Sequence, residues 1–132
     1  MNDKKLTVLE NDVILKEITA DEIVVTGNNV TLENCSAKTV TVTGERFIAR
    51  ECEFSSLSLE GAENALVAQS KLGALALNAC FNCSLVLNVA DAIKAADSKN
   101  VYVINNTVKG ELAITDCNYV IADENSFATL KA

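Results

Sequence analysis

Hydrophobic residues recur along this chain in pairs whose members are separated by a single residue. One stretch shows three such pairs in succession: Val30/Leu32, Cys35/Ala37 and Val40/Val42. A spacing of two places both members of a pair on one face of a β-strand. No apolar stripe with a helical period of 3.6 residues runs through any stretch of this kind. The pattern therefore predicts three short strands separated by corners.

The same arrangement returns every 17 or 18 residues. Its first apolar column reads Val13, Val30, Phe47, Ala65, Cys83, Val101 and Tyr119, and the third-strand pair Leu112/Ile114 follows a one-residue insertion near Gly110. A chain that turns three times and returns above its start forms a solenoid. We therefore predict an all-β, right-handed parallel β-helix of about seven triangular rungs of 17–18 residues, without a capping helix. Residues 1–132 are expected to form this one domain.

A column of mainly asparagine precedes the first strand of each rung. Its members are Asp12, Asn29, Arg46, Asn64, Asn82, Asn100 and Asn118. Asparagine tolerates the left-handed backbone conformation that corners need, and stacked amides can bond one another. We interpret this column as a structural ladder at a corner rather than as a ligand-binding site.

The five cysteines are odd in number, and we expect reduced, buried thiols rather than a disulfide framework or a zinc site. Cys35 and Cys52 fall in one inward column with Ile18, Ser70, Asn88 and Asn106. They should stack in neighbouring rungs about 4.8 Å apart. A redox pair is compatible with that distance but requires a side-chain orientation that spacing alone does not give.

The composition argues against catalysis, metal binding and binding to nucleic acid. The chain has no His, Pro or Trp, and its net charge of −7 opposes binding to nucleic acid or to an anionic membrane. Without histidine a Ser or Cys lacks its usual activating base, the acidic residues are scattered, and the corners are too short to build a groove. We expect no enzyme, no catalytic, cofactor-binding or metal-ligating residues, and no small-molecule ligand.

No run of apolar residues is long enough for a membrane span or a secretory signal, so a cytoplasmic location is expected.

The outward positions of the first strand are mostly apolar in the later rungs. The predicted interface consists of Ile48, Leu66, Ala68, Val86, Tyr102, Ile104, Val120 and Ala122. A contiguous apolar patch on an otherwise acidic molecule is typical of a contact with another chain. We expect a homo-oligomer, formed by lateral contacts through this face or by end-to-end contacts through uncapped terminal rungs.

Two stretches, Ile18–Gly27 and Cys35–Gly44, resemble the I-x-A-x-x-V-x-I-x-G stretch of bactofilins, which are bacterial cytoskeletal proteins. This resemblance implies a non-enzymatic, self-assembling scaffold in the cytoplasm. The chain has an Asn column in place of the Gly-Asn/Asp-Ile corner of that family. The alternative function is a carbohydrate- or protein-binding β-helix module related to pectate-lyase-like proteins.

Overall fold

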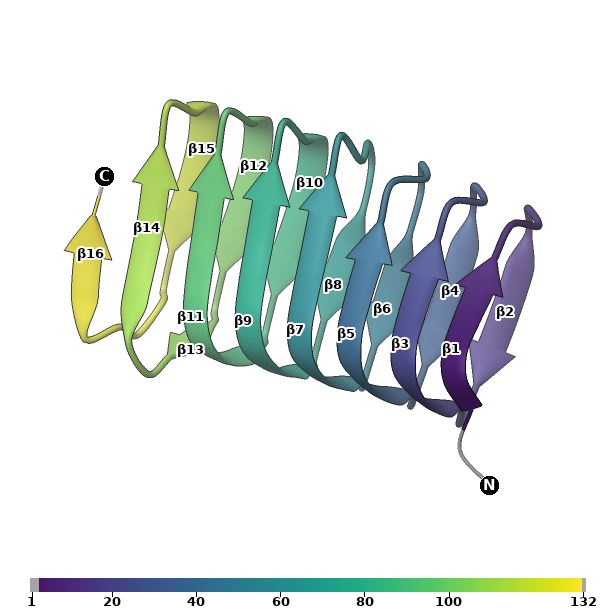
Figure 1. The fold of residues 1–132 in the computed structure, drawn as a ribbon. Coiled ribbons are helices and arrows are strands. Elements are labelled where there is room, and N and C mark those ends of the chain that lie inside the picture. The colour runs from purple at the N-terminus through teal and green to yellow at the C-terminus, as the bar shows by residue number, and fades with distance from the viewer. Residues whose placement is uncertain (1–2, 132) are drawn as a thin grey trace.

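The computed structural model describes residues 3–131 and shows a parallel β-solenoid of about seven turns of about 18 residues, without helices (Figure 1). All strand pairs are parallel, and successive strands of the chain alternate between two sheets except β13 and β14, which follow one another in the same sheet. In Figure 1 the chain rises in the front sheet, crosses over the top and descends in the rear sheet as it advances from the N-terminus. This path is a right-handed coil, the hand that parallel crossovers strongly prefer. The predicted fold class is confirmed.

The front sheet, called sheet A, has nine strands and the rear sheet, called sheet B, has seven. Sheet A contains β1 (Asp3–Val8), β3 (Thr19–Val25), β5 (Ser36–Val42), β7 (Glu53–Glu60), β9 (Lys71–Asn78), β11 (Val89–Ala96), β13 (Thr107–Val108), β14 (Glu111–Thr115) and β16 (Thr129–Lys131). Sheet B contains β2 (Val13–Lys16), β4 (Val30–Glu33), β6 (Ile48–Arg50), β8 (Leu66–Ala68), β10 (Phe81–Val86), β12 (Lys99–Ile104) and β15 (Asn118–Asp123).

Each turn has three inward-facing pairs, as predicted, but most turns contain two strands rather than three. In β3 the burial alternates except at Asp21 and Glu22, two successive residues that are not buried. A break in alternation is expected where a strand bends, so the predicted second and third strands are one strand with a corner inside it. Within residues 3–131 the corner interrupts the strand near Gly110, where it separates β13 from β14, and in the last turn, where an isolated bridge at Ser126 precedes β16.

The core is a stack of small inward columns. Ile23, Val40 and Leu57 lie in register in β3, β5 and β7, and each has 0% exposure. Phe47 is also buried, as its place in the first apolar column predicted, and so is Phe54. Because each side chain contacts the one above and below it, mainly aliphatic residues and thiols fill the narrow interior, together with these two phenylalanines.

The register of the last turn differs from the prediction. Val101 of β12 pairs with Val120 of β15, a spacing of 120 − 101 = 19 residues. The extra residue is the one recognised near Gly110, which shifts every later position and not only Leu112. A one-residue slip exchanges the two faces of a strand. Tyr119 is therefore not an inward residue: it lies at the corner and is 78% exposed.

The corner residues have the left-handed backbone that the sequence suggested. At the corner before the first strand of each turn, positive φ values occur at Asp12, Asn29, Arg46, Asn64, Asn82, Asn100 and Tyr119. Tyr119 therefore takes the place of Asn118 in the predicted column. Side-chain bonds join only some members: Asn29 Nδ2 donates to Asp12 Oδ1 over 2.7 Å, and Asn82 Nδ2 donates to Asn64 Oδ1 over 2.6 Å. The column is thus a series of left-handed corners with a partial ladder.

Candidate functional site: the outer face of sheet B and the two ends

The outer face of sheet B carries the apolar strip that the sequence predicted. Strand registers place Ile48, Leu66 and Tyr102 in one outward column, and Ala68, Val86 and Ile104 in the neighbouring one. All six side chains are partly exposed. They extend over β6, β8, β10 and β12, and so form a continuous surface across neighbouring strands.

Two of the predicted interface residues lie elsewhere. Val120 pairs with the buried Val101, and Ala122 pairs with the buried Val103, so both belong to inward columns. The one-residue shift of the last turn is the reason. In β15 the outward positions are Ile121, which is 53% exposed and pairs with Tyr102, and Asp123, which pairs with Ile104. We define the apolar strip by Ile48, Leu66, Ala68, Val86, Tyr102, Ile104 and Ile121.

Two large apolar residues occupy left-handed corners on either side of sheet B. Leu87 has φ 59° and is 51% exposed, and Tyr119 has φ 57°. At the corner that follows sheet B, the positions equivalent to Leu87 are all polar: Glu17, Asn34, Glu51, Gln69, Asn105 and Glu124. A left-handed conformation costs a side-chain-bearing residue about 1–2 kcal/mol. An exposed leucine at such a corner therefore has two unfavourable features: a strained backbone and apolar surface in contact with water. Such strain is typical of a functional surface.

The two ends of the solenoid present cross-sections of its core. Within residues 3–131, β1 and β2 have partners on one side only, and so do β15 and β16. Leu130 on β16 is 51% exposed although it lies in register with the buried Leu112. At the other end Leu15 and Val13 are only partly buried. Each end therefore combines apolar side chains with an open strand edge, which is a template for further β-pairing.

A buried polar ladder runs inside the solenoid, along an inward column whose members the sequence identified without revealing their bonds. Asn88 donates from Nδ2 to the carbonyl oxygen of Val67 over 2.9 Å and to Asn106 Oδ1 over 3.0 Å. Asn106 repeats the pattern with Leu85 and Asn125. The ladder ties successive turns together, and it satisfies amides that are 1% exposed.

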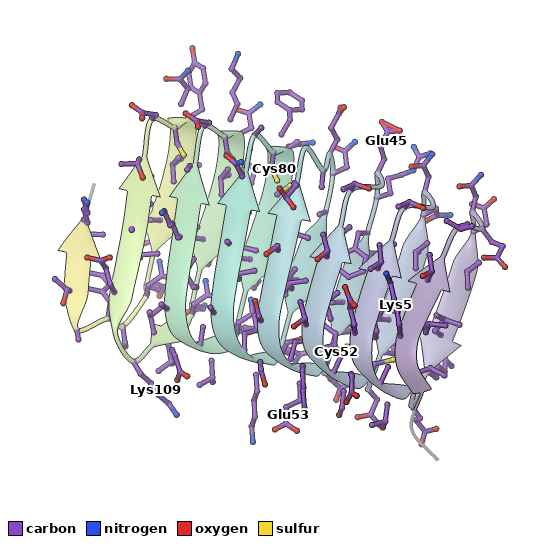
Figure 2. All side chains as sticks on the ribbon, viewed as in Figure 1. Lys5, Glu45, Cys52, Glu53, Cys80 and Lys109 are labelled. Carbon is purple, nitrogen blue, oxygen red and sulfur yellow. The ribbon has the colours of Figure 1, made fainter. Side chains whose placement is uncertain are left out.

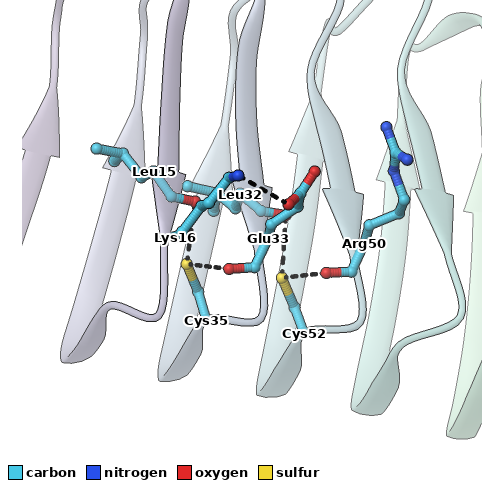
Figure 3. A network of polar contacts seen from close by, with 7 residues as sticks. All are labelled: Leu15, Lys16, Leu32, Glu33, Cys35, Arg50 and Cys52. Carbon is cyan, nitrogen blue, oxygen red and sulfur yellow. Dashed lines mark hydrogen bonds and ion pairs between the residues drawn. The ribbon is translucent and has the colours of Figure 1, made fainter.

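Two cysteines continue this column toward the N-terminus (Figure 3). Cys35 Sγ donates to the Leu15 carbonyl oxygen over 3.6 Å, and Cys52 Sγ donates to that of Leu32 over 3.2 Å. The neighbouring Cys52 thiol holds the pKa of Cys35 below its usual range, whereas the Cys35 sulfur and burial raise the pKa of Cys52. Cys35 and Cys52 thus each donate to a carbonyl oxygen of the preceding turn, as Asn88 and Asn106 do.

A second thiol pair is formed by Cys80 and Cys83, whose C-x-x-C spacing is the sequence signal that could have predicted it. The neighbouring Cys83 thiol holds the pKa of Cys80 below its usual range, and the Cys80 sulfur together with burial raises the pKa of Cys83. Both side chains are buried; Cys80 lies at the corner between β9 and β10, and Cys83 lies in β10. Cys117, the fifth cysteine, is partly exposed.

The burial of these thiols predicts how they react. In the folded protein we expect an aromatic disulfide reagent to modify Cys117 rapidly, while Cys35, Cys52, Cys80 and Cys83 react only after unfolding, because a thiolate must be reached by the reagent to react. A Cys117→Ser variant should show no fast phase. Rapid modification of two or more thiols in the native protein would contradict this burial.

A shallow hollow of about 690 Å³ follows the bend of sheet A on its outer side. The concavity follows the bend inside each long strand and therefore forms without a loop at the corners, which the sequence predicted to be too short to build a groove. Its charged residues alternate in sign from one turn to the next: Asp21, Lys38, Glu53, Lys71, Asp91 and Lys109. Figure 2 shows Glu53 and Lys109 projecting from the lower edge of the solenoid.

Ion pairs and metal ligands are sparse in the part of the chain that the structure describes. There, one ion pair is formed, between Lys16 Nζ and Glu33 Oε1 at 3.9 Å, and it lies on the early, polar part of sheet B. An exposed pair of this kind contributes tenths of a kcal/mol. Within residues 3–131 no cluster of three potential ligand side chains could hold a metal ion, and no membrane-spanning helix is found.

The fold places this chain in the class of parallel β-solenoid proteins. No protein-family profile, curated protein or solved structure matches the chain.

Proposed function

We propose that this protein is a non-enzymatic, self-assembling scaffold whose copies join through the ends of the solenoid. The observation that carries the proposal is that both ends present core side chains and open strand edges within residues 3–131. A second copy that continued the solenoid would pair β16 with its β1 and β15 with its β2. Parallel pairing of this kind buries apolar area and satisfies backbone groups in one step.

The columns of the solenoid support this continuation. Leu6 and Leu130 are the first and last described members of one inward column, so Leu130 would pack on Leu6 of the next copy. Val120 would likewise pack on Val13. These contacts repeat, between copies, the stacking that holds neighbouring turns together within one copy.

A corner bond could also be repeated between copies. The backbone N–H of Asn28 donates to Asn11 Oδ1 over 2.8 Å, and that of Glu45 donates to Asn28 Oδ1 over 2.9 Å. Asn118 occupies the same column in the last turn, where it pairs with Lys99. Its side-chain oxygen would be placed to accept from the N–H of Asn11 in the next copy.

The experiment is negative-stain electron microscopy of the wild type beside Leu130→Asp and the control Phe81→Asp. Elongated assemblies are expected for the wild type and the control, because Phe81 is an exposed residue at the start of β10, in the middle of the solenoid. Leu130→Asp should lose them, since it buries a charge at each junction. Assemblies that persist in Leu130→Asp, or are absent from the wild type, would contradict end-to-end stacking.

A second candidate function, a carbohydrate-binding module, is favoured by the hollow along sheet A. A neutral glycan offers hydroxyl groups that donate to Asp21 or Glu53 and accept from Lys38 or Lys71. Glycan-array binding that is retained by the Leu130→Asp variant, which cannot stack end to end, and lost in Lys71→Ala would favour this function over the scaffold.

A further inference from the structure

We propose that the apolar strip on sheet B is a symmetric, antiparallel contact with a second copy of this chain, with Val86 on the two-fold axis. This inference rests on the proposed self-assembly and specifies its lateral contact. Three features support it: the pattern of apolar residues on the strip, the charges at its two ends and the strained leucine at its centre.

The strip has a centre and two equal halves. β10 is the middle strand, with β8 and β6 on one side and β12 and β15 on the other. When two such faces pack with their solenoid axes antiparallel, a two-fold axis along β10 opposes β6 to β15 and β8 to β12 of the second copy. A contact of this type is isologous, so each pairing occurs twice.

The opposed side chains are compatible. In one column Leu66 would face Tyr102 of the second copy, and Ile48 would face Ile121. At the centre Ser84 would face its own mate, which allows a hydroxyl–hydroxyl hydrogen bond across the axis. In the other column Ala68 would face Ile104, a small residue against a large one, as interdigitating faces require.

The charges at the ends of the strip are complementary under the same symmetry. Arg50 pairs with Ala68 and ends the second column on one side, while Asp123 pairs with Ile104 and ends it on the other. Each lies two strands from Val86, so Arg50 would oppose Asp123 of the second copy at both ends of the contact. Opposite charges at these positions favour the antiparallel orientation, because parallel packing would place like charges together.

The centre of the strip carries a strained apolar corner. Leu87 follows Val86 directly and has a left-handed backbone and a half-exposed side chain. Under the proposed symmetry Leu87 lies near its own mate, where association would remove apolar surface from water. The same corner in the other turns is polar, so the apolar residue coincides with the symmetry centre.

The test uses Cys117→Ser/Leu130→Asp as the background, so that end-to-end stacking and the partly exposed thiol are both removed. Val86→Cys in this background is treated with a bis-maleimide whose reach is close to the roughly 10 Å between packed sheets. The matched control is Ile14→Cys, which is outward and 64% exposed on β2, outside the strip. We expect covalent dimers from Val86→Cys at about tenfold higher yield than from Ile14→Cys.

Charge reversal provides the second readout. In the Leu130→Asp background, Arg50→Asp alone or Asp123→Arg alone should weaken dimerisation about tenfold in sedimentation equilibrium, and the double reversal should restore it. A monomeric Leu130→Asp protein, or equal cross-linking at positions 14 and 86, would overturn the lateral contact. Wild-type assemblies seen by microscopy would in that case still support the proposed scaffold, so the two failures are distinguishable.

Discussion

Replacing Asn106 with leucine is expected to destabilise the solenoid by about 3–5 kcal/mol. Asn106 Oδ1 accepts from the backbone N–H of Asn88 over 2.9 Å and from its Nδ2 over 3.0 Å, while Asn106 Nδ2 donates to the Leu85 carbonyl oxygen over 2.9 Å. Leucine has a similar size but can replace none of these bonds. The N–H of Asn88 would then be buried without its partner, which costs more than the loss of an exposed bond.

The neighbouring Asn105 provides the matched control. It has φ 57° and an exposed side chain, so Asn105→Gly keeps the left-handed corner and should cost less than about 1 kcal/mol. Urea unfolding followed by circular dichroism, at one protein concentration because assembly also stabilises, measures both variants. Equal midpoints for the two variants would show that the ladder does not stabilise the fold.

The second large effect is expected from Gly44→Ala, which should lower the stability by about 3 kcal/mol or more. A Cβ atom at Gly44 would lie 2.0 Å from the carbonyl oxygen of Gly27 in the preceding turn. The atoms that a Cβ would clash with belong to the backbone, so the clash cannot be relieved by moving a side chain. The two turns would have to separate. The same unfolding measurement shows the effect.

Gly61 serves as the control for this prediction. It has φ 60°, and no atom lies within 4 Å of the position that a Cβ would take, so Gly61→Asn should be nearly neutral because asparagine tolerates this conformation. A Gly44→Ala protein as stable as Gly61→Asn would mean that the first turns do not approach one another closely enough to exclude a methyl group.

Much of the fold could be predicted from the sequence because a solenoid repeats one local pattern. Residues spaced by two set the inward face of each strand, and the recurrence of Val13, Val30 and Phe47 set the length of a turn. The columns derived from that recurrence agree with the strand registers up to Val101. Beyond the insertion near Gly110 the prediction was wrong for Tyr119, Val120 and Ala122, since a slip of one residue exchanges the inward and outward faces.

Other features depend on three-dimensional geometry that spacing does not encode. The bend inside β3 and its equivalents leaves one strand rather than two, and the hollow along sheet A follows from that bend. How far the buried asparagine ladder stabilises the fold depends on which inward amides donate a hydrogen bond to the preceding turn. Asn88 and Asn106 do so, while the asparagines of the outer corner are joined only in part.

The two proposed contacts involve different surfaces. End-to-end stacking uses the inward columns of the first and last turns, where Leu130 is half exposed, whereas lateral pairing uses the outward residues around Val86. A net charge of −7 opposes any association at low ionic strength, so we expect both contacts to be favoured by added salt.

Sedimentation velocity of the wild type over a wide range of protein concentrations shows whether copies of this chain assemble through their own surfaces. Self-assembly predicts species that grow with concentration well beyond the 14.1 kDa of one chain. A single species of 14.1 kDa at every concentration and salt condition would contradict it.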